Sequence, residues 1–238
     1  MARDRTEPAS RRDWSIAMAL YVDSAFLDDI AEIARSVPLA GVTTNPTIML
    51  AAYERGQRLD AESLLKELLH RVHGTIFIQP GETQEEEMFR QALSYIETNP
   101  ERVIPKIPMT KAGMRAALRL KFQGQRIAFT AVTTVAQAYS AAMTGADFII
   151  PYYNRLERCG IDASERIAQM AELLHNHGVA TRILAASIKS TAEAASALLA
   201  GAHDLTVAPP VLAEMITDPQ SEQAVERFAQ DWSKMNKV

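Results

Sequence analysis

The chain has 238 residues, 47% hydrophobic and 23% charged, with a formal net charge of -4 at pH 7. This composition is ordinary for a globular protein, and the length suits one large domain or two small ones. The slight negative charge gives no broad basic field, which excludes nucleic acid or an anionic membrane surface as the main partner. The single cysteine, Cys159, excludes an internal disulfide framework and favours a reducing compartment.

The N-terminal segment, residues 1–17, is charged, polar and without periodicity, so we expect a flexible tail there. The apolar run that follows, "IAMALYV", ends on Asp23 and lacks a small-residue cleavage pattern, which argues against a secretory signal. No apolar run approaches the roughly 20 residues of a transmembrane helix. We therefore expect a cytoplasmic protein in which residues 18–238 form one domain.

From residue 19 onward, short apolar runs alternate with helical patterns. The runs are "ALYV", "LAGV", "TIFI", "RVIP", "RIAF", "DFII", "TRILAA" and "DLTV". Helical patterns include residues 63–73, 83–96, 110–122 and 165–178, with Thr83 and Thr110 as expected caps, and a last helix at about 220–235. Eight strands separated by helices predict parallel pairing through right-handed crossovers. At this length they predict an α/β fold, a closed (β/α)8 TIM barrel with an additional C-terminal helix.

A doubly wound sheet is the competing architecture. The sequence has no G-x-G-x-x-G after the first run and no G-x-x-x-x-G-K-[ST] motif, which argues against it. In a barrel, the chemistry lies at the C-terminal ends of the strands. The side chains that end each run are therefore the candidate site residues.

Polar side chains end seven of the eight runs. In chain order they are Asp23, Thr43, Asn45, Gln79, Lys106, Thr130, Tyr152, Asn154, Arg155, Ser187 and Lys189. Each one alone is explained as a cap, a turn residue or a surface residue. Their convergence on one rim around a lysine favours an active site.

Lys106 lies in "VIPKIP", an apolar run with a proline on either side of the lysine. Taken alone, this pattern is typical of a strand that ends one residue early, with the lysine reaching water. Inside a barrel, desolvation instead lowers the pKa of the amine from about 10.4 and makes it a nucleophile. The reaction typical of such an amine is formation of a Schiff base with a carbonyl substrate.

The other strand-end residues complete this hypothesis. The iminium accepts electrons, and Asp23 takes the proton of a hydroxyl so that a neighbouring bond breaks. Gln79, Thr130 and Tyr152 can hold a water that moves protons to and from the enamine carbon. A phosphate suits the remaining group, Arg155, Ser187 and Lys189.

Other classes of site fit less well or stay open. We expect no metal and no cofactor, because none of the histidines (His70, His73, His175, His177 and His203) ends a strand. Cys159 is most simply an inert thiol. A non-catalytic phosphosugar-binding barrel, or an isomerase that uses Lys106 as an electrostatic clamp, fits the same residues. Trapping of a reducible imine would separate these alternatives from an aldolase.

Five segments together resemble the small transaldolase and fructose-6-phosphate aldolase family: "LYVDS", "PLAGVTTNPTI", "VIPKIPMTKAGM", "TAVTTVAQAYSAAMTGADFIIPYYNR" and "ILAASIKS". The similarity runs from about Ala19 to Trp232. It implies a class I barrel that acts on a sugar phosphate, with Lys106 as the imine former. It also implies a homo-oligomer, a pentamer or decamer, whose C-terminal helices pack on neighbouring subunits. The residues it assigns to substrate or water are Asp23, Asn45, Gln79, Thr130, Tyr152, Arg155 and Ser187.

Two positions discriminate within this family. Transaldolases usually carry Glu where Gln79 stands and Phe where Tyr152 stands. The resemblance therefore favours reversible cleavage of a ketose phosphate, such as fructose 6-phosphate, to dihydroxyacetone and glyceraldehyde 3-phosphate. A transaldolase that transfers the dihydroxyacetone unit is the alternative. Four departures from the aldolases leave the natural sugar and the local strand geometry open: Pro105, Thr133, Ile188 and the loop "NRLERCG".

Overall fold

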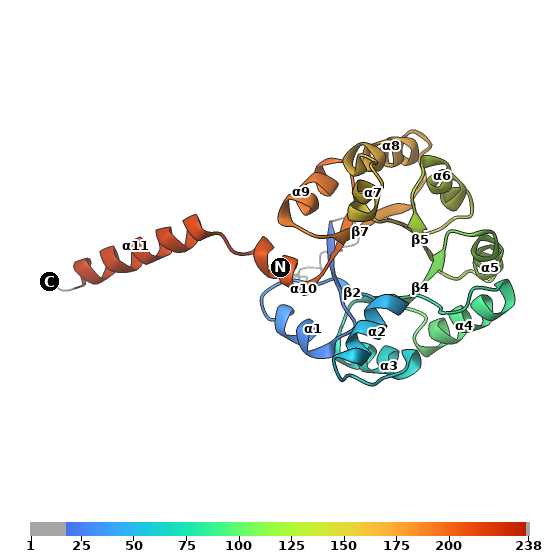
Figure 1. Cartoon of the computed structure of the whole chain (residues 1–238), viewed down its shortest axis with the longest axis horizontal. Coiled ribbons are helices and arrows are strands. Elements are labelled where there is room, and N and C mark those ends of the chain that lie inside the picture. Colours follow the sequence, from blue (N-terminus) through green and yellow to red (C-terminus); the bar gives the residue numbers. More distant parts are fainter. Residues whose placement is uncertain (1–17, 237–238) are drawn as a thin grey trace, which may run out of the picture.

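A closed barrel of parallel strands forms the centre of the protein, whose computed structural model describes residues 18–236. Neighbouring strands pair in chain order, and the eighth pairs back onto the first (Figure 1). The strands are β1 (Ala19–Asp23), β2 (Gly41–Thr43), β3 (Thr75–Ile78), β4 (Val103–Pro108), β5 (Ala128–Val132), β6 (Phe148–Pro151), β7 (Arg182–Ile188) and β8 (Asp204–Val207). The predicted tail, residues 1–17, lies outside the described residues.

Helices follow every strand and form the outer ring of the barrel (Figure 1). They are α1 (Leu27–Ile33), α2 (Pro46–Glu54), α3 (Ala61–Arg71), α4 (Glu85–Thr98), α5 (Lys111–Phe122), α6 (Val135–Met143), α7 (Tyr153–Arg158), α8 (Ala163–Asn176), α9 (Thr191–Leu199) and α10 (Pro209–Met215). A last helix, α11 (Pro219–Met235), follows them and lies outside the ring. The prediction of a (β/α)8 barrel with an additional C-terminal helix is confirmed. None of the helices within residues 18–236 combines the length and the hydropathy needed to cross a bilayer.

The expected helix caps hold in one case and fail in the other. Thr110 caps α5, because its side chain accepts a hydrogen bond from the N–H of Gly113. Thr83 does not cap α4. That helix begins at Glu85 after Gln84, and the three glutamates of its first turn complement the positive end of the helix dipole.

Strand alternation separates the two faces of the barrel wall. Outward residues such as Val22 and Val42 pack against the helices. Inward residues such as Tyr21, Phe77 and Ile104 fill the lumen. Because successive side chains of a strand point to opposite faces, the same alternation turns one residue near the end of each strand toward the upper mouth.

β4 continues through Pro105, so the lysine strand does not end early. Its first half pairs with β3, where Ile78 lies opposite Pro105, and its second half pairs with β5, where Lys106 lies opposite Ala128. Lys106 is only 1% exposed. The simple interpretation in which this lysine reaches water is therefore wrong.

α11 extends away from the barrel, as Figure 1 shows. None of its residues is buried in the described chain. Its apolar side chains Val225, Phe228, Trp232 and Met235 are all exposed. They recur at intervals of three and four residues, so they share one face of the helix.

Candidate active site

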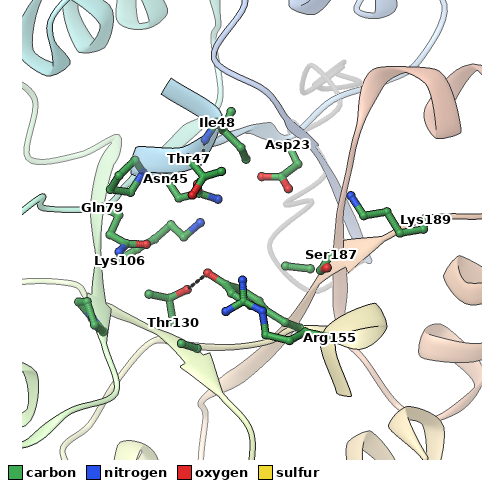
Figure 2. A pocket seen from close by; sticks show the side chains of 15 residues that line it. Asp23, Asn45, Thr47, Ile48, Gln79, Lys106, Thr130, Arg155, Ser187 and Lys189 are labelled. Atoms are coloured by element: carbon green, nitrogen blue, oxygen red, sulfur yellow. Dashed lines mark hydrogen bonds between the residues drawn. The ribbon is translucent and has the colours of Figure 1, made fainter. Parts of the chain in front are cut away.

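A cavity of about 400 Å³ opens at the C-terminal ends of the strands. The predicted residues on its wall are Asp23, Asn45, Gln79, Lys106, Thr130, Tyr152, Arg155, Ser187 and Lys189. Figure 2 shows the Lys106 side chain reaching into this space, with Asp23 and Thr130 on either side of its amine. The strand ends thus bring together, around one lysine, residues that are far apart in the sequence.

Lys106 is a buried amine held by one main-chain group. Its Nζ donates a hydrogen bond to the carbonyl oxygen of Thr44 at 2.8 Å. Burial lowers the pKa of Lys106, and the nearby charge of Asp23 offsets part of this effect. At a given pH, Lys106 is therefore the neutral amine, which is the nucleophilic form, in a larger fraction of the molecules.

Asp23, at the end of β1, is a half-buried carboxylate that accepts a hydrogen bond from a buried hydroxyl. Burial raises its pKa, while Lys106, the hydrogen bond from Thr43 and Lys189 lower it. Thr43 Oγ1 lies 2.6 Å from Asp23 Oδ1 and 2.6 Å from Thr206 Oγ1. An ionised carboxylate only accepts, so Thr43 donates to Asp23 and accepts from Thr206. This directional chain occupies Oδ1, and Oδ2 is the oxygen that remains for a further donor.

Thr43 therefore has a different place from the predicted one. It is fully buried beneath Asp23 and does not line the cavity. Thr206 was missed altogether, because the end of β8 carries no ionisable group. The alternation of "DLTV" is the signal that was available, since it places Thr206 on the same inward face as Asp204.

Thr130 and Tyr152 form a second hydroxyl pair, 2.7 Å apart. Burial raises the pKa of Tyr152, and the hydrogen bond with Thr130 and the charge of Arg155 lower it. The Arg155 guanidinium lies 4.5 Å from the centroid of the Tyr152 ring. The Tyr152 hydroxyl stays protonated near neutral pH, so it can both donate and accept a hydrogen bond.

Asn45 lies at the start of α2, where its side chain is held. Its Oδ1 accepts a hydrogen bond from the N–H of Ile48 at 3.0 Å and so caps the helix. The amide group of the same side chain remains on the cavity wall. The "TTNPT" motif thus both starts a helix and supplies a donor to the site.

Two wall residues have backbone conformations that L-residues rarely adopt. Ser187 has φ 60° and Ala131 has φ 58°. Both occur where strand register shifts, in β7 between Ala185 and Ile188 and in β5 next to Thr130. Such positions cost about 1–3 kcal/mol each and persist only where the surrounding structure fixes them. The irregularities re-aim the chain at the mouth of the barrel.

Asn154 does not lie on the cavity wall. Its Nδ2 donates to Glu193 Oε1 at 2.9 Å, which joins α7 to α9. The structure therefore separates Asn154 from its neighbour Arg155, which does line the cavity.

The sequence matches the family described as transaldolase/fructose-6-phosphate aldolase over residues 20–238. The chain belongs to this family. It is 36% identical over 215 residues to a probable transaldolase of Symbiobacterium thermophilum, covering 90% of this chain and 97% of that protein. It is 36% identical over 220 residues to a probable transaldolase of Alkaliphilus metalliredigens, covering 92% of this chain and 100% of that protein.

Among solved structures, the chain is similar to a mutant of mandelate oxidase with the monooxide FMN adduct. The TM-score is 0.54 at 14% identity, and the match covers 82% of this chain and 65% of that one. At this identity the likeness shows the shared barrel fold alone.

Membership of the transaldolase/fructose-6-phosphate aldolase family makes this protein one of a family of enzymes. The residues that the family resemblance assigned to substrate or water all lie on the wall of the one cavity. No group of three or more His, Cys, Asp or Glu side chains within residues 18–236 is placed to hold a metal ion. Cys159 is exposed at the end of α7.

Proposed function

We propose that this protein is a class I aldolase that works through an imine on Lys106. Its reaction is the reversible cleavage of a ketose phosphate, such as fructose 6-phosphate, to dihydroxyacetone and glyceraldehyde 3-phosphate. The observation that carries the proposal is the burial of Lys106 at the wall of a polar cavity, with a lowered pKa and Asp23 nearby.

The reaction begins with attack of the neutral Lys106 amine on the substrate carbonyl. Loss of water from the adduct gives an iminium. Asp23 then takes the proton of the hydroxyl on the carbon two away from the iminium carbon, and the bond between that hydroxyl-bearing carbon and the carbon next to the iminium breaks. The aldehyde leaves, and the electron pair of the broken bond moves onto the iminium to form an enamine on Lys106.

Release of the second product requires a proton on the enamine carbon. A water held by Gln79, Thr130 and Tyr152 can deliver it, and a second water then hydrolyses the imine and restores the amine. Gln79 is neutral and cannot titrate, so the Tyr152 hydroxyl is the proton source or relay. This arrangement favours release over retention of the enamine for transfer to another aldehyde.

The phosphate of the substrate binds to the basic residues of the cavity wall. Arg155 lies in α7, which follows β6, Ser187 lies near the end of β7, and Lys189 comes directly after β7; all three line the cavity. A guanidinium, a hydroxyl and an ammonium together provide the donors that a phosphate accepts.

Transaldolase activity is the second candidate, because the relatives in Symbiobacterium thermophilum and Alkaliphilus metalliredigens are named probable transaldolases. Both reactions share the enamine and differ only in its fate. Free dihydroxyacetone is therefore measured from fructose 6-phosphate, with and without erythrose 4-phosphate as acceptor. We expect release with little transfer, and the double variant Gln79→Glu with Tyr152→Phe should reverse this preference. Faster transfer than release by the unmodified protein would make it a transaldolase.

We also propose a homo-oligomer in which α11 packs on a neighbouring subunit, with the pentamer or decamer of the family resemblance as the expected size. The exposed face of Val225, Phe228, Trp232 and Met235 supports it, since an amphipathic helix with no buried residue needs a partner for its apolar side. Light scattering should give a multiple of the 26.2 kDa chain mass. Trp232→Glu with Phe228→Glu should reduce that multiple.

A further inference from the structure

Glu193 makes contacts on two sides of the β6–β7 mouth without lining the cavity. It occupies the third position of α9, and its N–H donates to the capping Ser190 Oγ at 3.1 Å. Its carboxylate Oε2 accepts from the N–H of Lys189 at 2.8 Å, one residue before the cap. Its Oε1 accepts from Asn154 Nδ2 at 2.9 Å, on α7. One carboxylate therefore ties the loop after β7 to the helix after β6.

The main-chain pairing between β6 and β7 ends before the segments that Glu193 connects. β6 pairs with β7 through Phe148 and Ile149, and an isolated bridge joins Tyr152 to Ala186. Beyond that bridge, the hydrogen bonds of Glu193 link the two segments. Glu193 is half-buried, and the first turn of a helix favours its negative charge.

The tied residues are immediate neighbours of the proposed phosphate donors. Asn154 precedes Arg155, and Lys189 itself lines the cavity two residues after Ser187. Arg155 and Lys189 are exposed, flexible side chains, so their position depends on where the main chain is held. Ser187 has φ 60°, a conformation that persists only when its surroundings fix it.

We propose that Glu193 is a positioning residue that sets the spacing of these two segments and so gives the enzyme its preference for phosphorylated substrates. The inference rests on the proposed function, in which Arg155, Ser187 and Lys189 hold the phosphate. Glu193 acts through Asn154 and the Lys189 main chain, and it touches neither the phosphate nor the reacting carbons. Asn154 accordingly serves this tie and makes no direct contact with the sugar.

The test compares two aldehydes that differ only in the phosphate, glyceraldehyde 3-phosphate and glyceraldehyde. Both aldehydes can react as acceptors with the enamine on Lys106, in an aldolase and in a transaldolase alike. The test therefore does not depend on which of the two activities the enzyme has. We expect Glu193→Ala to raise KM for the phosphorylated aldehyde about tenfold, because small displacements of positioned groups have large effects. KM for glyceraldehyde, and kcat for both, should change less than about twofold. Competitive inhibition by inorganic phosphate should weaken in Glu193→Ala by a factor similar to the rise in KM for the phosphorylated aldehyde.

Three further variants separate positioning from general stability. Asn154→Ala should reproduce the Glu193→Ala effect, and the double variant should be no worse than either single one, because both remove the same tie. Glu193→Gln should restore most of the preference, since a flipped Asn154 amide can accept from the new amide nitrogen. Glu165→Ala is the matched control, because Glu165 holds the same helix position in α8 and its hydrogen bonds within residues 18–236 are local, to Asp162 and Gln169.

Two results would overturn the inference, and they differ in what they say of the proposed function. If the unmodified enzyme prefers the phosphorylated aldehyde and Glu193→Ala and Asn154→Ala both keep that preference, the positioning role is wrong and the phosphate site stands. If the unmodified enzyme does not distinguish the two aldehydes, the phosphate site and the role of Glu193 both fail.

Discussion

The barrel interior holds a cation and an anion at each end, and the two sets are arranged in opposite ways. At the base, Asp204 is completely buried and receives two hydrogen bonds of 2.7 Å from Arg182, through Nε and Nη2. The main-chain N–H of Ala19 adds a third at 2.8 Å. Each oxygen of this buried carboxylate has a donor, which is the condition under which a buried ion pair is tolerated.

At the mouth, Lys106 is buried and Asp23 is half-buried, and each binds a group other than its opposite charge. Lys106 donates to a carbonyl, Asp23 accepts from a hydroxyl, and no ion pair joins the two among the described residues. Burial therefore favours the neutral form of each, lowering the pKa of Lys106 and raising that of Asp23. The ion pair at the base joins two strands of the barrel, whereas the amine and carboxyl group at the mouth, unpaired among the described residues, stay available to react with a substrate.

The largest expected effect follows from removing the amine at the mouth. Lys106→Met should lower kcat by at least about 10⁴-fold, because no other group replaces the nucleophile. Borohydride with dihydroxyacetone should add the reduced donor to one peptide of the unmodified enzyme and to none in the variant, as read by mass spectrometry. Lys189→Met is the control and should still be labelled. Labelling that persists in Lys106→Met would remove the imine from this lysine.

The next largest effect concerns the ion pair at the base of the barrel. Asp204→Asn should lower the free energy of unfolding by about 2–3 kcal/mol, because the asparagine amide lacks the negative charge that pairs with Arg182 in the unmodified protein. The value lies at the lower end of the range because the Arg182 side chain is 25% exposed. Denaturant unfolding measures the change, and kcat of the folded fraction should stay the same. A change in the free energy of unfolding below about 0.5 kcal/mol would mean that the ion pair between Arg182 and Asp204 does not stabilise the fold.

Lys106→Met should have the opposite effect on stability, raising the free energy of unfolding by about 1–2 kcal/mol near neutral pH. The folded pKa of Lys106 lies below its unfolded value, so the unfolded chain binds more protons in the window between them. Stability of the unmodified protein therefore rises with pH across that window, and the methionine variant lacks this rise.

The advantage of the variant should thus shrink as the pH approaches about 10.4, the ordinary lysine value. The raised pKa of Asp23 acts in the other direction, as the pH rises from its ordinary value through its folded value, so the comparison is made on the alkaline side, toward the ordinary lysine value. Unfolding curves of both proteins at three or more pH values measure the difference. A difference that is constant or grows with pH would contradict a lowered pKa of Lys106.

The barrel could be predicted from the sequence because the number of apolar runs and their regular alternation with helical patterns indicate the same fold. Eight apolar runs separated by helical patterns leave few topologies, and strand ends that meet at one rim identify most of the cavity wall. Lys106 was predictable for the same reason, as the single charge within a buried run.

The residues that support the site were not predictable in this way. The alternation of β8 indicates on which face Thr206 lies, but its contact with Thr43, 163 positions away in the sequence, is not contained in that pattern. Asn154 follows Tyr153, where α7 begins directly after β6, and the rotation of a helix sends neighbouring side chains in different directions. Such support depends on the packing of elements, which a local pattern does not contain.

The smallest expected effect tests how the carboxylate at the mouth is held. Thr206→Val removes the donor to Thr43, whose hydroxyl still donates to Asp23 but is no longer polarised or oriented by a partner. Stabilisation of the ionised form of Asp23 weakens, so the pKa of Asp23 should rise further. The acid limb of the pH profile of kcat/KM should move to higher pH, with a loss of about two- to fivefold on that limb and little change above it. Thr181→Val is the matched control, because Thr181 is a buried threonine whose hydroxyl donates to the Ala146 carbonyl away from the cavity. An acid limb that stays in place in Thr206→Val, or that moves equally in both variants, would show that the hydroxyl chain does not tune Asp23.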